Sequence, residues 1–233
     1  MTGPHPHSGG TFELEVSVDE TATPTTPAEH YFFAAELNRL GVKWVSMAPR
    51  FIGRFEKGVD YIGDLEAFRA SFARHVGVMR TAGPYKISIH SGSDKFAIYP
   101  IVAELAGGLV HLKTAGTSYL EAVRTVAGID PGLFRHIYDF AREHYDTDRK
   151  TYHVSADMSK VPPAAAFSDG ELAGRIDDFH TRQALHCTFG SVLTAGGGKL
   201  FRDRLCAALA DDEEAHYANL AAHLGRHLEP FRS

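Results

Sequence analysis

A strand pattern followed by a helix pattern occurs four times in this chain, which limits the folds open to it. Each strand pattern alternates apolar and polar residues, and the four segments are spaced by roughly thirty residues, as in strand–helix–strand units. They are "TFELEVSVDE", "VKWVSMAP", "YKISIH" and "GLVHLKTAG", starting at residues 11, 42, 85 and 108. This order predicts a parallel α/β sheet. No GxGxxG motif follows the first strand, so a (β/α) barrel of the TIM type, or part of one, is favoured over a dinucleotide-binding fold.

Several residue types mark where the helices begin. Thr26 is a candidate N-cap with Pro27 at the first helical position, and Gly41 lies past the expected end of that helix. Asp64 is expected to cap a second helix that extends to about Arg80. Further helices are expected at about 95–105, 117–128, 131–144 and within 200–228, and the ambiguous segment 182–193 is a candidate fifth strand. We therefore expect a disordered lead over residues 1–10 and a single α/β domain over 11–233.

The predicted strands carry polar residues on one side, which is unusual for a parallel sheet covered by helices on both faces. Because side chains alternate along a strand, each strand presents its polar row to a common side. These residues are Glu13, Glu15, Ser17 and Asp19 on the first strand, Ser46 and Arg50 at the second, Ser88 and His90 on the third, His111 and Lys113 on the fourth, and His186 and Thr188 on the candidate fifth. Buried charges need partners or a ligand, so this side is expected to form a site.

Active sites of (β/α) barrels lie at the carboxyl ends of the strands, where Asp19, Glu20, Arg50, His90, Lys113 and His186 are expected. Two explanations without a functional site remain open. A polar row also suits the solvent side of an antiparallel edge strand, and a single inward histidine is more often a hydrogen-bonded core residue than a ligand.

Individual residue types suggest roles within that site. Burial of Glu15 in its strand is expected to raise its pKa and to suit it to acid or base catalysis. His90 is a candidate metal ligand, and Glu56, which is equally well explained as a solvated loop charge, is a candidate second ligand of the same ion. Arg50 and Lys113 suit an anionic substrate. Asp19 and His186 are expected to contact the substrate as well.

Composition narrows the classes of partner. The formal net charge of −5 argues against nucleic-acid binding, which requires a basic surface. The 14 histidines mildly favour proton transfer or metal binding, although His216, His223 and His227 near the end of the chain are expected at the surface. The two cysteines, Cys187 and Cys206, form no metal motif and are typical of a reducing compartment. No apolar run suits a membrane span or a signal peptide, so a cytoplasmic location is expected.

Five segments of the chain closely resemble the tagaturonate epimerase family of hexuronate catabolism. They are "ELEVSVDETATPTTPAEHYF", "APRFIGRFEKGVDYIGD", "SIHSGSDKFAIYPI", "HLKTAGTSYLEAVR" and "RHLEPF". The resemblance implies an isomerase on a barrel-like α/β fold, which interconverts D-tagaturonate and D-fructuronate with a divalent metal cation. It also implies Glu15 as a proton donor and His90 and Glu56 as metal ligands.

Members of that family are considerably longer, so the chain is expected to correspond to their C-terminal half. The four or five predicted strands agree, since a closed barrel needs eight. The chain is therefore expected to form a homo-oligomer or to require a missing N-terminal half.

The reaction can be reasoned from the two sugar acids, which differ at a hydroxyl-bearing carbon that is not adjacent to the ketone. A retro-aldol route is predicted: loss of the hydroxyl proton, C–C cleavage to an enediolate and an aldehyde, rotation, and re-addition to the other face. Two rival functions are kept: another metal-dependent sugar isomerase or aldolase, and an inactive half-barrel that binds sugar acids or needs a partner half.

Overall fold

The computed structural model describes residues 12–114 and 116–232. The predicted disordered lead at 1–10 lies outside the described residues. None of the helices in the described part of the chain has the length and apolar character that a membrane crossing requires.

A four-stranded parallel sheet forms the first part of the molecule, in agreement with the predicted class. Its strands are β1 (Glu15–Ser17), β2 (Ser46–Ala48), β3 (Lys86–Ile89) and β4 (Val110–Leu112), in the spatial order β1-β2-β3-β4. Each strand is shorter than the alternating segment that predicted it. The register aligns Glu15 with Ser46 and Ser88 with His111, so residues of the polar rows are neighbours across the sheet.

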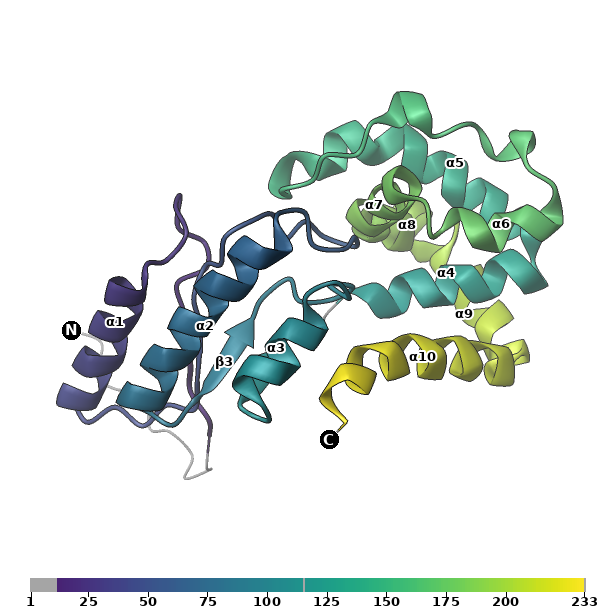
Figure 1. Ribbon diagram of the computed structural model, residues 1–233. Coiled ribbons are helices and arrows are strands. Elements are labelled where there is room, and N and C mark those ends of the chain that lie inside the picture. Colours follow the sequence, from purple (N-terminus) through teal and green to yellow (C-terminus); the bar gives the residue numbers. More distant parts are fainter. Residues whose placement is uncertain (1–11, 115, 233) are drawn as a thin grey trace, which may run out of the picture.

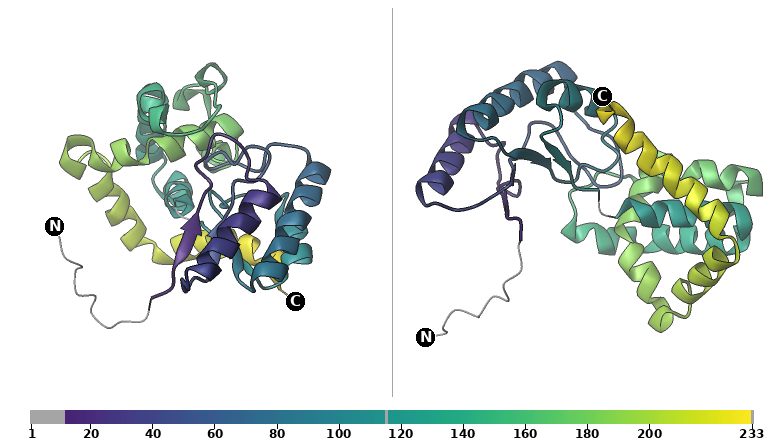
Figure 2. Two further views of the ribbon diagram at one scale, coloured as in Figure 1. Left: turned by 90° about the vertical axis from the view of Figure 1, so that its left-hand side faces the viewer. Right: turned by 90° about the horizontal axis from the view of Figure 1, so that it is seen from below.

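Three helices pack against this sheet, and Figures 1 and 2 show them together on one side of it. They are α1 (Pro27–Arg39), α2 (Leu65–Ala82) and α3 (Tyr99–Ala106). Crossovers between parallel strands are right-handed, so strands in sequential order place every connecting helix on the same face. The strand order therefore explains why the opposite face can carry polar side chains.

The predicted helix starts are largely confirmed. Thr26 caps α1 in a capping box with Glu29, and Asp64 caps α2 by accepting a hydrogen bond from the Ala67 amide at 2.7 Å. The helix expected from about residue 95 begins at Tyr99 instead, after turns over residues 96–98. Asp94 before them has left-handed backbone geometry at φ 60°, which an α-helix does not accommodate.

The second part of the molecule is helical. It contains α4 (Thr117–Ile129), α5 (Pro131–Asp148), α6 (Asp169–Arg175), α7 (Phe179–Cys187), α8 (Phe189–Thr194), α9 (Arg202–Asp211) and α10 (Glu213–Leu228). Short 3₁₀ turns occur at Arg149–Thr151, Met158–Lys160, Ala164–Ala166, Ala195–Gly198 and Glu229–Phe231. The predicted C-terminal helical region is thus two helices, divided at Asp212, which caps the second one.

The candidate fifth strand at 182–193 is wrong, because this segment forms α7 and α8. Asp178 caps α7 by accepting hydrogen bonds from the amides of His180 and Thr181. All residues of α7 from Thr181 to Cys187 are buried, so the segment lacks the one-sided periodicity that identifies a surface helix.

Two main hydrophobic cores correspond to the two parts of the chain. One lies between the sheet and α1–α3, and the other lies among α4–α9. Helix α10 lies alongside α4, as Figure 1 shows, and the final turn, Glu229–Phe231, packs against α3. Phe231 contacts the core under the sheet, where its ring centroid lies 6.1 Å from that of Tyr99. The end of the chain therefore joins its helical part back to the sheet.

Helices α1 and α2 are joined by a buried pair of histidines. Nδ1 of His30 lies 3.0 Å from Nδ1 of His75, and the hydroxyl of Tyr85 lies 2.8 Å from Nε2 of His30. Burial lowers the pKa of both imidazoles to about 4, with a further contribution from the charge of His75 on His30 and of Arg74 on His75. Both rings are therefore neutral in the folded protein at neutral pH.

We predict that acid destabilises this packing. Between pH 6.5, the ordinary pKa, and about 4, the unfolded chain binds protons that the folded chain excludes, so stability decreases as pH falls. Each imidazole contributes a slope of up to about 1.4 kcal/mol per pH unit in that window. Urea unfolding from pH 7 to pH 5 should show a steeper loss of free energy of unfolding for the unchanged chain than for His75→Gln. Equal slopes would show that the pair does not control acid stability.

Candidate functional site

The polar face of the sheet is organised around the carboxylate of Glu15. Its Oε1 lies 2.6 Å from Nε2 of His90, and its Oε2 lies 2.6 Å from Oγ of Ser46 and 2.9 Å from Nδ1 of His111. The hydroxyl of Ser88 lies 3.3 Å from the same His111 nitrogen. Side chains from β1, β2, β4 and the end of β3 thus meet on one face, as the polar rows predicted.

These contacts overturn the expected rise in the pKa of Glu15. Burial alone raises this pKa, but hydrogen bonds with Ser46, His90, His111 and Ser88 together outweigh burial and lower the pKa to about 2. The side chain is only partly buried, at 25% exposure, so the desolvation cost is moderate. Glu15 is therefore a carboxylate at neutral pH in this structure, and its role in proton transfer stays a prediction.

His90 lies between two carboxylates at the end of β3. Its Nε2 faces Glu15, and its Nδ1 lies 3.1 Å from Oδ1 of Asp19. The imidazole is 12% exposed, and Asp19 also accepts a hydrogen bond from the hydroxyl of Ser17. The site therefore contains an imidazole through which a proton can pass between two acidic groups.

The loop after β3 places the residues that follow His90. Ser91 and Asp94 both have left-handed backbone geometry, at φ 49° and 60°. Gly92 leaves no room for a side chain, because a Cβ atom there would lie 2.6 Å from the carbonyl oxygen of Ile89. The ammonium group of Lys95 is fully buried and donates to three carbonyl oxygens. They belong to Glu56, at 2.9 Å, to Ser93, at 3.0 Å, and to Val59. Lys95 thus holds this loop against the loop after β2.

A pocket of about 120 Å³ opens between these loops and helix α7. It is lined by Asp19, Glu20, Lys57, Gly58, His90, Ser91, Ser93, Lys113 and His186. Four of the predicted site residues, Asp19, His90, Lys113 and His186, therefore lie around one cavity, although His186 reaches it from a helix and not from a strand. Sequence reasoning missed Lys57, which follows Glu56 in a glycine-bearing loop without any periodic signal.

Two lysines give the pocket a basic side that suits an anion. Nζ of Lys57 donates to Oγ of Ser91 at 2.9 Å. Burial and then the charge of Lys113 lower the pKa of Lys57, while Asp19 and Glu20 oppose that change. Lys57 and Lys113 form a basic side that can hold a carboxylate.

His186 is a neutral member of the same pocket. Burial, and then the charges of Lys57 and Arg182, lower its pKa to about 4. Gly58 and Gly116 give its ring space: both have positive φ, and a Cβ atom on either would lie 3.0–3.2 Å from the His186 side chain. His186 is therefore placed to exchange hydrogen bonds without adding charge.

Three predicted residues do not line the pocket: Glu15, which lies on the sheet face described above, Glu56 and Arg50. The carboxylate of Glu56 accepts hydrogen bonds from Ser155 Oγ at 2.8 Å and from Gln183 Nε2 at 2.9 Å, and it is 6% exposed. The Arg50 main chain pairs with Thr25 through its amide and its carbonyl oxygen. Metal binding by Glu56 and substrate binding by Arg50 stay predictions.

The donor set at the sheet edge suits a divalent cation in part. Imidazole and carboxylate are ordinary ligands of divalent transition metals. His90 Nδ1 and Asp19 Oδ1 lie 3.1 Å apart, close to the separation of neighbouring ligands around one ion. These two groups are the adjacent donors that would hold such an ion.

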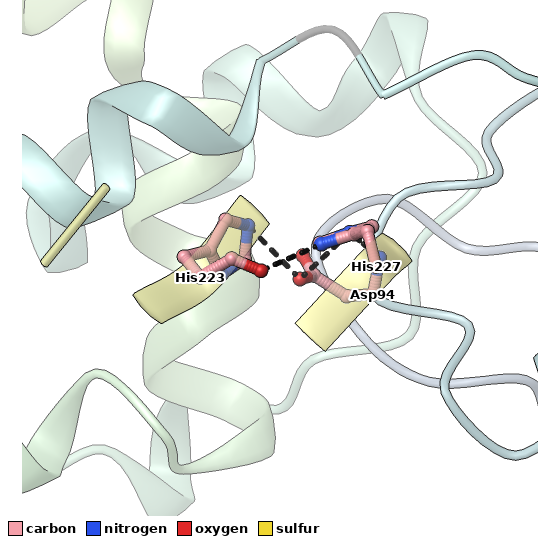
Figure 3. A group of neighbouring side chains, drawn as sticks. All are labelled: Asp94, His223 and His227. Carbon is pink, nitrogen blue, oxygen red and sulfur yellow. Dashed lines mark hydrogen bonds and ion pairs between the residues drawn. The ribbon is translucent and has the colours of Figure 1, made fainter. Parts of the chain in front are cut away.

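A different group of donors lies in the interior. His223 and His227, which were expected at the surface, are buried together with Asp94, and donor atoms of all three lie within 4.8 Å of one another. Figure 3 shows the two imidazoles and the carboxylate converging. The prediction for the histidines is wrong because α10 packs its His223–His227 face against α4 and the loop after β3.

Comparisons with known proteins agree on one family. The model of the tagaturonate epimerase family matches residues 5–231. A tagaturonate/fructuronate epimerase of Thermotoga maritima is 48% identical over 218 residues, which are 94% of this chain and 45% of that protein. The chain thus spans somewhat less than half the length of that curated relative.

Solved structures give the same result. The native crystal structure of the fructuronate-tagaturonate epimerase of Cohnella laeviribosi superposes with a TM-score of 0.92 at 43% identity, over 96% of this chain and 46% of that one. A structure of the same protein with one glycerol gives equal values. Because the family model and both relatives cover nearly the full length of the chain, the chain belongs to the tagaturonate epimerase family.

Proposed function

We propose that this chain carries the sugar-acid site of an isomerase that interconverts D-tagaturonate and D-fructuronate. The observation that supports this proposal most is that His90 contacts the carboxylates of Glu15 and Asp19 next to the pocket. Lys57 and Lys113 lie on the basic side of that pocket. A hexuronate has a carboxylate to pair with the lysines and hydroxyl groups to reach the acidic side. The relatives named above carry this activity in their names.

The ionised carboxylate of Glu15 suits the first proton transfer of the predicted retro-aldol route. A base takes the proton of the hydroxyl on the second carbon from the ketone; the bond between that carbon and the carbon next to the ketone breaks, leaving an aldehyde and an enediolate. After rotation of the aldehyde, the enediolate carbon attacks its other face and the proton returns to the new alkoxide. Nε2 of His90, in contact with Oε1 of Glu15, holds that carboxylate in position.

A divalent cation held by His90 and Asp19, with Glu56 as a further proposed ligand, would stabilise the negative charge of an enediolate. The resident side chains have separate tasks. Lys57 and Lys113 bind and orient the substrate carboxylate, and neutral His186 contacts a hydroxyl group. The Glu15 carboxylate accepts and returns the proton. Arg50 and the cytoplasmic location stay predictions.

The barrel is part of this proposal. Four parallel strands in sequential order, with the helices on one face, are the arrangement expected of half a (β/α)₈ barrel and support this proposal. The second candidate function is therefore a half-site that binds sugar acids and turns them over only beside a complementary half. This second function is favoured by the match to the Thermotoga relative, which covers only 45% of that protein.

Replacing the central carboxylate tests the chemistry. Glu15→Gln should lower the rate of tagaturonate–fructuronate exchange about 100-fold or more, because the amide cannot accept the proton. The rate is measured by ¹³C NMR with a divalent cation added. Glu13→Gln, an exposed position on the same segment, is the matched control. Full activity of Glu15→Gln would remove this residue from the mechanism.

Neutralising the basic side tests substrate orientation. Lys57→Gln and Lys113→Gln should each weaken the binding of D-tagaturonate about tenfold, measured by titration calorimetry. The control Lys199→Gln, at an exposed turn away from the pocket lining, should leave this binding unchanged. Binding of neutral D-tagatose should be unaffected by all three changes. A loss that is equal for both sugars would mean that the lysines do not recognise the carboxylate.

Assembly separates the two candidate functions. The sheet has edge strands β1 and β4, and exposed edges favour association with another chain. On gel filtration with light scattering, we expect a dimer or larger species that turns over D-tagaturonate. A monomer that binds D-tagaturonate without converting it would favour the half-site.

A further inference from the structure

A buried junction joins α10 to the loop after β3, apart from the residues that line the pocket's acidic and basic sides. His223 and His227 lie one turn apart on α10, and Asp94 faces them from the loop, as Figure 3 shows. The three side chains are 4–5% exposed. Two histidines four residues apart on a helix present their rings to the same point, which is a common way to bind a metal.

The distances between these side chains suit a shared ion. Oδ1 of Asp94 lies 3.4 Å from Nε2 of His223 and 3.8 Å from Nε2 of His227. Neighbouring ligands of a tetrahedral ion with bonds of about 2.0–2.1 Å are separated by about 3.3 Å. The ligand atoms therefore need only a small inward movement to coordinate one ion.

The Asp94 carboxylate has one satisfied and one unsatisfied oxygen. Oδ2 accepts from Nη2 of Arg182 at 3.0 Å, while the buried Oδ1 has no hydrogen-bond partner among the described residues. A buried carboxylate oxygen without a donor is costly, because it has lost its water. A cation between Oδ1 and the two imidazoles would remove that cost.

The outer nitrogens of both rings face the kinds of group that metal-binding histidines use. Nδ1 of His227 donates to the carbonyl oxygen of His223 at 2.9 Å. Nδ1 of His223 lies 3.4 Å from Oε1 of Glu121, an oxygen that has no hydrogen-bond partner among the described residues. A backbone carbonyl or a carboxylate on the outer nitrogen directs the unprotonated Nε2 toward the ion.

The charged groups nearest the junction offset one another. Asp94 and Glu121 are acidic, Arg182 approaches both at 3.0 and 3.9 Å, and Arg124 pairs with Glu121. An ion here would therefore be held by the unsatisfied Oδ1 of Asp94 and the two imidazoles, and not by an excess of negative charge.

Hydrogen bonds within the protein compete with an ion at this place. Nε2 of His227 accepts from the Asp94 amide at 3.0 Å, and Nε2 of His223 lies 3.1 Å from Oγ1 of Thr117. These bonds hold the rings near the required positions, and an ion would replace them. The hydroxyl group of Thr117 or of Ser93 is close enough to act as a fourth ligand.

We propose that Asp94, His223 and His227 form a structural binding site for a divalent transition metal of the Zn²⁺ or Co²⁺ class. The site joins the C-terminal helix to the loop that supplies Ser91 and Ser93 to the pocket. This site is separate from the cation site proposed at His90 and Asp19, and it does not depend on the proposed function.

Cobalt binding tests the site without an activity readout. The His90→Gln variant, which lacks the cation site proposed at His90, is treated with chelator and titrated with Co²⁺ while its visible absorption is recorded. We expect the chain to bind one equivalent of Co²⁺ and to show the strong absorption bands of four-coordinate Co²⁺. Adding His223→Gln or His227→Gln should abolish the bands and the accompanying rise in melting temperature. His216→Gln, on the same helix outside the cluster, should leave both unchanged.

Absence of Co²⁺ binding by the His90→Gln chain, or unchanged binding after either glutamine substitution in the cluster, would overturn the proposal. Circular dichroism checks that each variant is folded. If the cluster variants do not fold, X-ray absorption of the Zn²⁺-loaded His90→Gln chain decides: scattering from two imidazoles supports the site, and scattering from one or none contradicts it.

Discussion

The ionised carboxylate of Glu15 is the constraint on which the site depends. A charge on the face of a sheet needs several partners, and Glu15 obtains them from neighbouring strands through Ser46, His111 and His90. These contacts require the parallel register observed here and a face that the connecting helices leave open. The same contacts lower the pKa of Glu15, so one set of hydrogen bonds orders the sheet face and sets the protonation state that the proposed chemistry uses.

The pocket beside this face is built by loops that are held from within. Lys95 is fully buried, and its ammonium group binds carbonyl oxygens of two loops. Burial lowers its pKa to about 8, with the charges of Asp94 and Asp60 opposing that change. The neighbouring Asp94 pairs with Arg182 of α7 and lies against α10. The helical part of the chain thus holds the loop after β3 in place beside the pocket, although its hydrophobic core is separate from the core under the sheet.

Much of the architecture could be predicted from local patterns. The four strand–helix repeats predicted a parallel sheet, and capping residues such as Thr26 and Asp64 predicted helix starts, because both signals act over a few residues. The polar rows predicted that Glu15 and His90 would meet. The segment 182–193 misled because a helix buried on all sides has no polar stripe to reveal its period.

The sequence by itself determined the fold class, the polar face of the sheet and the family, since these follow from short-range periodicity and from motifs along the chain. Only the tertiary structure decided that Lys57 and His186 meet His90 at one pocket, and that His223 and His227 are buried against Asp94. Residues more than a hundred positions apart come together through packing of α7 and α10, which local propensity does not encode. The pKa of Glu15 likewise depends on partners from other strands, so its fall to about 2 could not be read from its own segment.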